Sequence, residues 1–232
     1  MKALLFDLDD TICRTRIKFM EKITECINFL SQEAPKLNRE EWKKELEGVN
    51  NRLFEKYAVN PKRWYLVVEE VRKKHQLPKE ITGRAREILR QIYLERLDFL
   101  DGAEEALVGL RELGVELKIV THASKKWTRL KYKNWLKLDR FLRWEDVFAV
   151  NINEHKTDSS WLMACDYFEV KPNEVGVVGD SPRSNINPVR RIGVEKCFLV
   201  EDEIQWSVHN QPIDEGVIKV KNLIGVLDYF HS

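Results

Sequence analysis

The segment ALLFDLDDT, residues 3–11, decides the fold of this chain. Its apolar run gives way to acids at Asp7 and Asp9, which is typical of a buried parallel strand with polar groups at its carboxyl end. We predict that strand over residues 3–8. Open α/β sheets bind their ligands at this edge, so the segment predicts both a fold class and the place where chemistry would occur.

Beyond residue 101 the chain alternates between strand-like and helix-like segments. The predicted strands lie at 116–121, 147–150, 175–180, 196–200 and 217–220, and the predicted helices at 103–113, 124–138, 158–168 and 185–192. Such alternation predicts an α/β fold, a Rossmann-like parallel sheet flanked by helices on both faces. The first strand belongs to the same sheet.

The block between these parts, residues 15–97, has a different sequence pattern. It is rich in charge, carries apolar residues at helical spacing, as at Phe19, Ile23 and Ile27, and has almost no strand signal. Prolines divide it into about four helices. We therefore predict a catalytic core domain of residues 1–14 and 98–232, with an all-helical domain of residues 15–97 inserted into it.

Composition excludes several classes of protein. The 232 residues are 43% hydrophobic and 33% charged, which suits a folded chain with an apolar core. The formal net charge of +1 provides no large-scale field for nucleic acid or an anionic membrane. No apolar window reaches the roughly 18 residues of a membrane-spanning helix, and the start has no signal-peptide pattern. We expect a cytoplasmic monomer or homodimer with reduced cysteines and no nucleic-acid or membrane partner.

Polar residues follow four of the predicted strands. Asp7 and Asp9 lie at the carboxyl end of the first, Thr121 ends the second, Lys156 lies just past the third, and Asp180 ends the fourth. Each is unremarkable alone, because a lone Lys in a loop is usually a solvated side chain and a Thr after a strand is common. Their conjunction, in this order and at these strand ends, predicts one site.

This set resembles the four motifs of the haloacid dehalogenase (HAD) superfamily of phosphohydrolases. The matching residues are the DxDxT of residues 7–11, Thr121, Lys156 and Gly179-Asp180. The resemblance covers about residues 1–14 and 98–232, and the helical insertion is similar in position and size to the family's type-one cap domain. Family dehalogenases lack the second acid of the first motif, so Asp9 favours phosphate chemistry.

The charges predict a cation in the site. Two carboxylates about 4 Å apart repel by about 4 kcal/mol at an effective dielectric constant of about 20, so three acids cannot stay ionised together unaided. A Lys and a divalent cation would compensate, and oxygen ligands favour Mg²⁺. The resemblance implies that the ligands are the Asp7 side chain, the Asp9 backbone carbonyl and the Asp180 side chain.

The resemblance also implies a role for each catalytic residue. Asp7 attacks phosphorus to form an aspartyl-phosphate, and Asp9 protonates the leaving oxygen and later deprotonates water. Thr121 binds a phosphoryl oxygen, while Lys156 neutralises charge on the nucleophile and the phosphoryl group. The backbone N–H groups of Leu8 and His122 are expected to help bind the phosphate.

Two further residues depart from the motifs or lie beside them. Where the family commonly has another acid after the fourth motif, this chain has Ser184 and Asn185. We expect Asn185 to orient Lys156 or a metal-bound water without adding charge. Arg16 follows the first motif closely and is a candidate contact for the substrate.

These residues predict a HAD-like phosphoric monoester hydrolase, a Mg²⁺-dependent phosphatase acting on a small phosphorylated metabolite. A phosphomutase or other phosphotransferase would use the same residues. A non-catalytic binding or regulatory protein with the same fold is the alternative from a different class. A dehalogenase is the least favoured reading.

Overall fold

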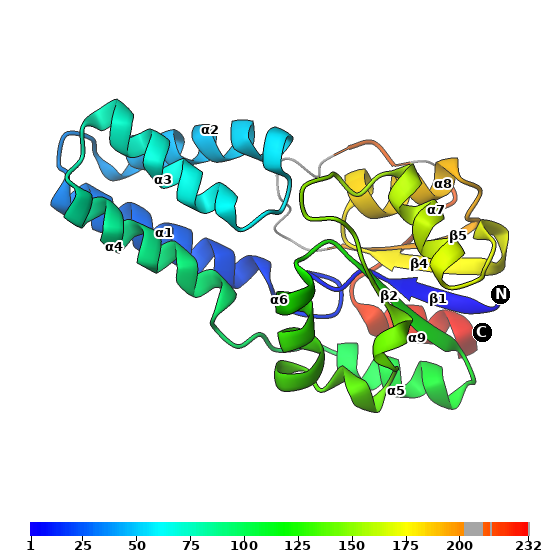
Figure 1. Ribbon diagram of the computed structural model, residues 1–232. Coiled ribbons are helices and arrows are strands. Elements are labelled where there is room, and N and C mark those ends of the chain that lie inside the picture. The colour runs from blue at the N-terminus through cyan, green and yellow to red at the C-terminus, as the bar shows by residue number, and fades with distance from the viewer. Residues whose placement is uncertain (202–210, 214, 232) are drawn as a thin grey trace. The chain divides into compact units, whose positions relative to one another are not determined.

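The chain divides into two compact units. The computed structural model describes residues 1–201, 211–213 and 215–231. Unit 1 comprises Met1–Thr15, Leu97–Asn151 and His155–Ser232, and unit 2 comprises Arg16–Arg96 and Ile152–Glu154. Unit 1 holds the strands, whereas the long helices α1 to α4 form unit 2 (Figure 1).

Unit 1 is built on a parallel sheet that, in the described part of the chain, has six strands in the order β3-β2-β1-β4-β5-β6. The strands are β1 Ala3–Phe6, β2 Glu116–Thr121, β3 Val147–Ala149, β4 Val175–Gly179, β5 Lys196–Val200 and β6 Ile218–Val220. The predicted α/β sheet is therefore confirmed, with each strand within two residues of its expected bounds. The order places β1 between β2 and β4, so the polar ends of these three strands are neighbours.

Helices cover both faces of this sheet (Figure 1). One face, which includes Leu5 and Val177, packs against Trp161 of α7 (Asp158–Tyr167) and Val189 of α8 (Asn187–Arg191). The other face lies against α5 (Ala103–Glu112) and α9 (Leu223–His231), as shown by Phe198, whose ring centre is 5.1 Å from that of Tyr229 in α9. The apolar strand runs of the sequence are explained by this burial on both sides.

Two segments expected as plain α-helix are wound differently. The predicted helix 124–138 is a short α-helix, α6 (Lys125–Arg129), followed by a π-helical turn, Leu130–Trp135. The predicted helix 185–192 is preceded by a second π-helical turn, Pro182–Ile186, which leads into α8. Isolated π-helical turns hold one extra residue per turn and are frequent at functional sites. Short 3₁₀ turns complete the unit at Leu138–Arg140, Trp144–Asp146 and Pro172–Glu174.

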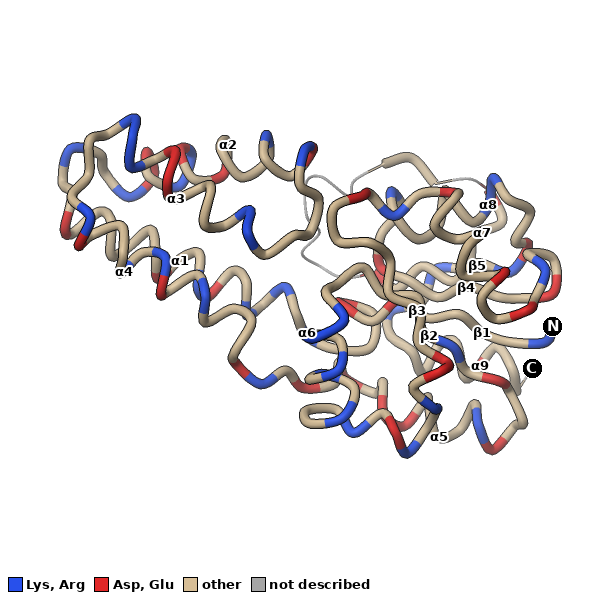
Figure 2. The backbone as a smooth tube through the Cα atoms, viewed as in Figure 1, with Lys and Arg blue, Asp and Glu red and all other residues tan. Residues whose placement is uncertain are grey.

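Unit 2 contains its own apolar core. Its elements are α1 Arg16–Glu33, α2 Arg39–Tyr57, α3 Lys62–His75, α4 Lys79–Arg90 and a 3₁₀ turn, Gln91–Tyr93. Asn38 starts α2 with a capping box, its side chain accepting from Glu41 N at 3.0 Å. Trp42 and Val67 are fully buried within the core, while both signs of charge are interspersed along the helices (Figure 2).

The two segments of unit 1 that flank the long helices are paired with each other. Leu100 N donates to Ile12 O at 2.9 Å, and Arg14 N donates to Asp98 O at 3.0 Å. Cys13 and Phe99 form an antiparallel bridge between the same segments. The chain thus leaves unit 1 and re-enters it at one point.

The four cysteines are free and buried, in agreement with the expectation of reduced thiols. Burial raises the pKa of Cys165 to about 11. Across the described residues, no helix is both long enough and apolar enough to cross a membrane.

Candidate active site

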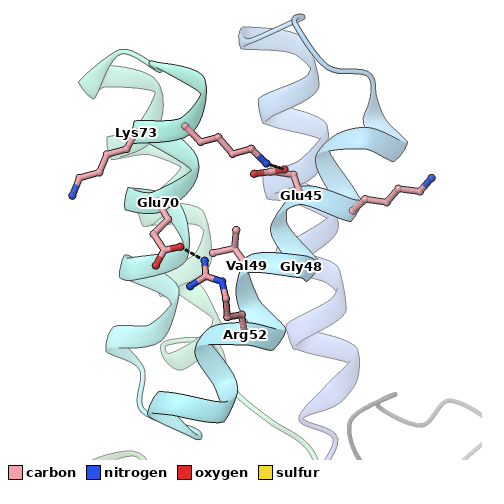
Figure 3. A pocket seen from close by; sticks show the side chains of 8 residues that line it. Glu45, Gly48, Val49, Arg52, Glu70 and Lys73 are labelled. Carbon is pink, nitrogen blue, oxygen red and sulfur yellow. Dashed lines mark hydrogen bonds and ion pairs between the residues drawn. The ribbon is translucent and has the colours of Figure 1, made fainter.

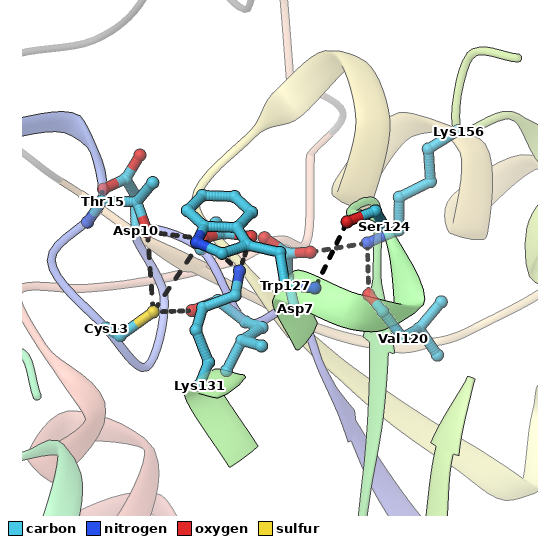
Figure 4. A network of polar contacts seen from close by, with 11 residues as sticks. Asp7, Asp10, Cys13, Thr15, Val120, Ser124, Trp127, Lys131 and Lys156 are labelled. Atoms are coloured by element: carbon cyan, nitrogen blue, oxygen red, sulfur yellow. Dashed lines mark hydrogen bonds and ion pairs between the residues drawn. The ribbon is translucent and has the colours of Figure 1, made fainter. Parts of the chain in front are cut away.

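Lys156 joins several polar groups at the sheet edge, and Figure 4 shows its ammonium between Asp7 and Val120. Its buried ammonium donates to Asp7 Oδ1 at 2.8 Å, to Val120 O at 2.7 Å and to Asn185 Oδ1 at 2.9 Å. It also stands 4.4 Å from the centre of the Trp161 ring. These contacts fix the ammonium beside the Asp7 carboxylate and join the ends of β1 and β2 to the π-helical turn that holds Asn185.

Asn185 connects Lys156 to the acid that follows β4. Its Nδ2 donates to Asp180 Oδ1 at 3.1 Å while its Oδ1 accepts from Lys156. This close approach requires glycine at position 179, because a Cβ added there would lie 2.5 Å from the Asn185 Cβ. The sequence suggested this side chain as an orienting group, and the structure shows hydrogen bonds that suit the role.

Asp7 is a buried carboxyl directly after β1. Its backbone N–H donates to Val178 O at 2.9 Å, which places it next to the end of β4. Burial raises the pKa of the Asp7 carboxyl, and the adjacent Lys156 ammonium opposes that rise. A further cation at this position would favour the carboxylate form.

The negative charge of Asp9, contrary to the expectation, is compensated by a lysine of its own. Its carboxylate accepts from Lys131 Nζ at 2.7 Å through Oδ1 and at 2.6 Å through Oδ2, and Oδ1 also accepts from the Thr15 hydroxyl. The expectation of three acids with a single Lys is therefore wrong, because a second Lys compensates one acid directly. Sequence analysis missed Lys131, which a regular helix over 124–138 gave no reason to place in the site.

The loop after β1 is held by Asp10. This residue has a positive φ of 57°, and its Oδ1 accepts from Thr15 N at 3.0 Å. Its own backbone N–H donates to Cys13 O at 2.8 Å. Asp10 therefore shapes the turn that carries Asp9, which is a structural task.

The remaining predicted residues fall in different places. Thr121 is the last residue of β2, fully buried, and its hydroxyl has no hydrogen-bond partner among the described residues. His122 follows it and is partly exposed, and the backbone of Leu8 hydrogen-bonds the Asp7 carboxyl. Arg16 is the first residue of α1, so it belongs to unit 2.

A groove of about 620 Å³ also opens in unit 2, between α2 and α3 (Figure 3). Charged side chains bridge it, with Lys74 donating to Glu45 at 2.7 Å and Arg52 pairing with Glu70. None of the predicted catalytic residues lines this groove. Two of its four cations pair with these acids, and we assign the groove no ligand.

A protein-family model for haloacid dehalogenase-like hydrolases matches residues 1–193, most of the chain. The chain belongs to this family. The HAD motifs identified in the sequence are thus carried by a HAD-like hydrolase fold. A comparison with curated proteins finds no match.

Solved structures share the fold of this HAD-like chain. A haloacid dehalogenase-like family hydrolase from Xanthomonas campestris has a TM-score of 0.78 at 16% identity, covering 100% of this chain and 91% of that one. A HAD phosphatase from Thermococcus onnurineus has a TM-score of 0.63 at 19% identity, covering 99% and 98%. YfnB from Bacillus subtilis, bound to magnesium, has a TM-score of 0.69 at 14% identity, covering 100% and 99%.

Other similar structures are described as dehalogenases. At such identities the likeness shows the fold alone. The choice among family reactions therefore depends on the residues of this site.

Proposed function

We propose that the chain is a Mg²⁺-dependent phosphatase acting on a small phosphorylated metabolite, with unit 2 as its cap domain. The observation that carries the proposal is Asp9, a second acid on the loop that follows the Asp7 strand end, held by two donors from Lys131 and Thr15. Phosphate ester cleavage needs a proton donor for the leaving oxygen in addition to a nucleophile. Asp7 and Asp9 supply these two groups.

The residues present fit a hard divalent cation. Asp7 and Asp180 are buried carboxyls beside neighbouring strand ends, and the Asp9 backbone carbonyl is the proposed third oxygen ligand. Across the described residues, no group of three or more His, Cys, Asp and Glu side chains is placed to hold a metal. Mg²⁺ suits such a sparse set, since it binds through one or two carboxylates and keeps positions for water and phosphate.

In the proposed reaction, Asp7 forms a bond to phosphorus as the bond to the leaving oxygen breaks, and Asp9 gives that oxygen its proton. Lys156 offsets the charge near Asp7. The partnerless Thr121 hydroxyl is a ready donor to a phosphoryl oxygen, with the Leu8 and His122 backbone as further donors. When bound, Mg²⁺ would supply charge neutralisation at the phosphoryl oxygens. Arg16 is the proposed substrate contact from unit 2.

Phosphate release from a panel of phosphorylated metabolites tests the proposal. We expect turnover with Mg²⁺ and a loss of at least about 100-fold with a chelator, since the acids of the site would lose their compensating charge. Readdition of Mg²⁺ should restore the rate. Transfer of phosphate within the substrate without release would indicate a phosphomutase. If neither phosphate release nor phosphate transfer occurs with any substrate, a binding or regulatory protein is favoured.

Asn185→Asp tests the link between Lys156 and Asp180. The new carboxylate keeps an acceptor for Lys156 and adds negative charge beside Asp180, so we expect activity to be retained. The Mg²⁺ concentration for half-maximal activity should fall by about 10-fold. A titration with Mg²⁺ measures this, with the exposed Asn134→Asp as the matched control. An unchanged titration would remove Asn185 from the metal environment.

A further inference from the structure

Lys131 is a buried cation whose partner comes from the loop after β1. Its side chain is 0% exposed, and both of its bonds to the Asp9 carboxylate are shorter than 2.8 Å. Burying an ammonium is costly unless it is paired and hydrogen-bonded. The contact with Asp9 therefore offsets the free-energy cost of burying the Lys131 ammonium.

The Lys131 side chain lies beside the Trp127 ring (Figure 4). Trp127 lies four residues earlier on the same face of the helix, and its ring centre is 3.9 Å from the Lys131 ammonium. Lys131 is the second residue of the π-helical turn Leu130–Trp135, while Lys133 in the same turn is exposed. The turn thus buries one of two closely spaced lysines.

We propose that Lys131 is a positioning residue for Asp9, an inference that rests on the proposed phosphatase function. Lys131 holds both carboxyl oxygens, and Thr15 holds one of them, so the rotation of the Asp9 side chain is restricted. As the Asp7–phosphorus bond forms and the ester bond breaks, the Asp9 proton passes to the leaving oxygen. The carboxylate that remains is the species that Lys131 pairs with. It accepts a proton from water as the water oxygen bonds to phosphorus and the Asp7–phosphorus bond breaks, which releases phosphate and frees Asp7.

A leaving-group comparison separates this role from a structural one. Phenyl phosphate and p-nitrophenyl phosphate are similar in size, but the nitrophenolate leaves without needing a proton. For Lys131→Met, which keeps an unbranched side chain, we expect kcat/KM to fall by about 10-fold or more for phenyl phosphate. For p-nitrophenyl phosphate it should fall by less than about 3-fold, because the proton donor contributes little there.

Lys133→Met is the matched control, since it removes an exposed Lys from the same π-helical turn. It should leave both substrates within about 2-fold of the wild type, as expected for a surface substitution. Equal losses of Lys131→Met on the two substrates, or no loss on either, would overturn the proposal.

If Lys131→Met fails to give a cooperative thermal transition, Thr15→Val tests the other anchor of Asp9 with a side chain of the same shape. The same selective loss on phenyl phosphate is then expected, and equal losses would overturn the inference. A wild type that releases no phosphate from either substrate with Mg²⁺ would contradict the proposed function itself, and the positioning role would fall with it. If the wild type turns over both substrates but the variants lose activity equally on the two, only the positioning role is contradicted.

Discussion

Asp7→Asn is expected to abolish phosphate release, lowering kcat by on the order of 10³-fold or more, because an amide cannot act as the nucleophile toward phosphorus. Steady-state phosphate release measures the loss. Acid quenching should also trap phosphate on the wild-type protein and none on the variant. The thermal transition of the variant should be recorded, since Lys156 loses a charged partner.

Asp139→Asn is a suitable control, because it removes an exposed carboxylate from the same unit. We expect it to match the wild type. Equal phosphate release by wild type and Asp7→Asn would exclude the covalent route through this side chain.

Asp9→Asn is expected to separate the two halves of the reaction. With p-nitrophenyl phosphate the leaving group needs no proton, so Asp7 still becomes phosphorylated, but no base remains to activate water. A burst of about one nitrophenolate per protein should precede a slow phase. With an alkyl phosphate, which needs the acid from the start, the rate should fall by about 10²- to 10⁴-fold without a burst.

Rapid-mixing absorbance measurements would resolve the burst, and mass spectrometry would detect the added phosphoryl group. The variant leaves Lys131 facing a neutral amide, so its fold should be checked by circular dichroism. Sustained turnover of p-nitrophenyl phosphate by Asp9→Asn at the wild-type rate would contradict the role of Asp9 as the base.

The sheet could be predicted because its strands carry a local signal. The runs at 116–121 and 196–200 have the same bounds in sequence and structure. Each apolar run ends in polar residues, and parallel strands bring those ends to one edge of the sheet. This logic is sufficient to predict that Asp7, Lys156 and Asp180 lie near one another.

Lys131 could not be predicted in this way. Its partner, Asp9, is 122 positions away in the sequence, and no local periodicity reports such a pair. The stretch 124–138 contains many charged residues, and a regular helix would place most of them in water. The π-helical turn, the ring of Trp127 and the pairing with Asp9 account for the burial of this Lys.

The pairing of residues 12–14 with residues 98–100 has an evolutionary consequence. Because the residues before and after the insertion pair there, the inserted polypeptide is a loop closed at its base. The entropic free-energy cost of closing such a loop rises by only about 0.6 kcal/mol for each doubling of its length. Modules of different size and fold can therefore be exchanged at this junction while the hydrolase scaffold stays intact. Under the proposed role of unit 2 as a cap, selection for new substrates would act on this module and leave the residues of the sheet edge unchanged.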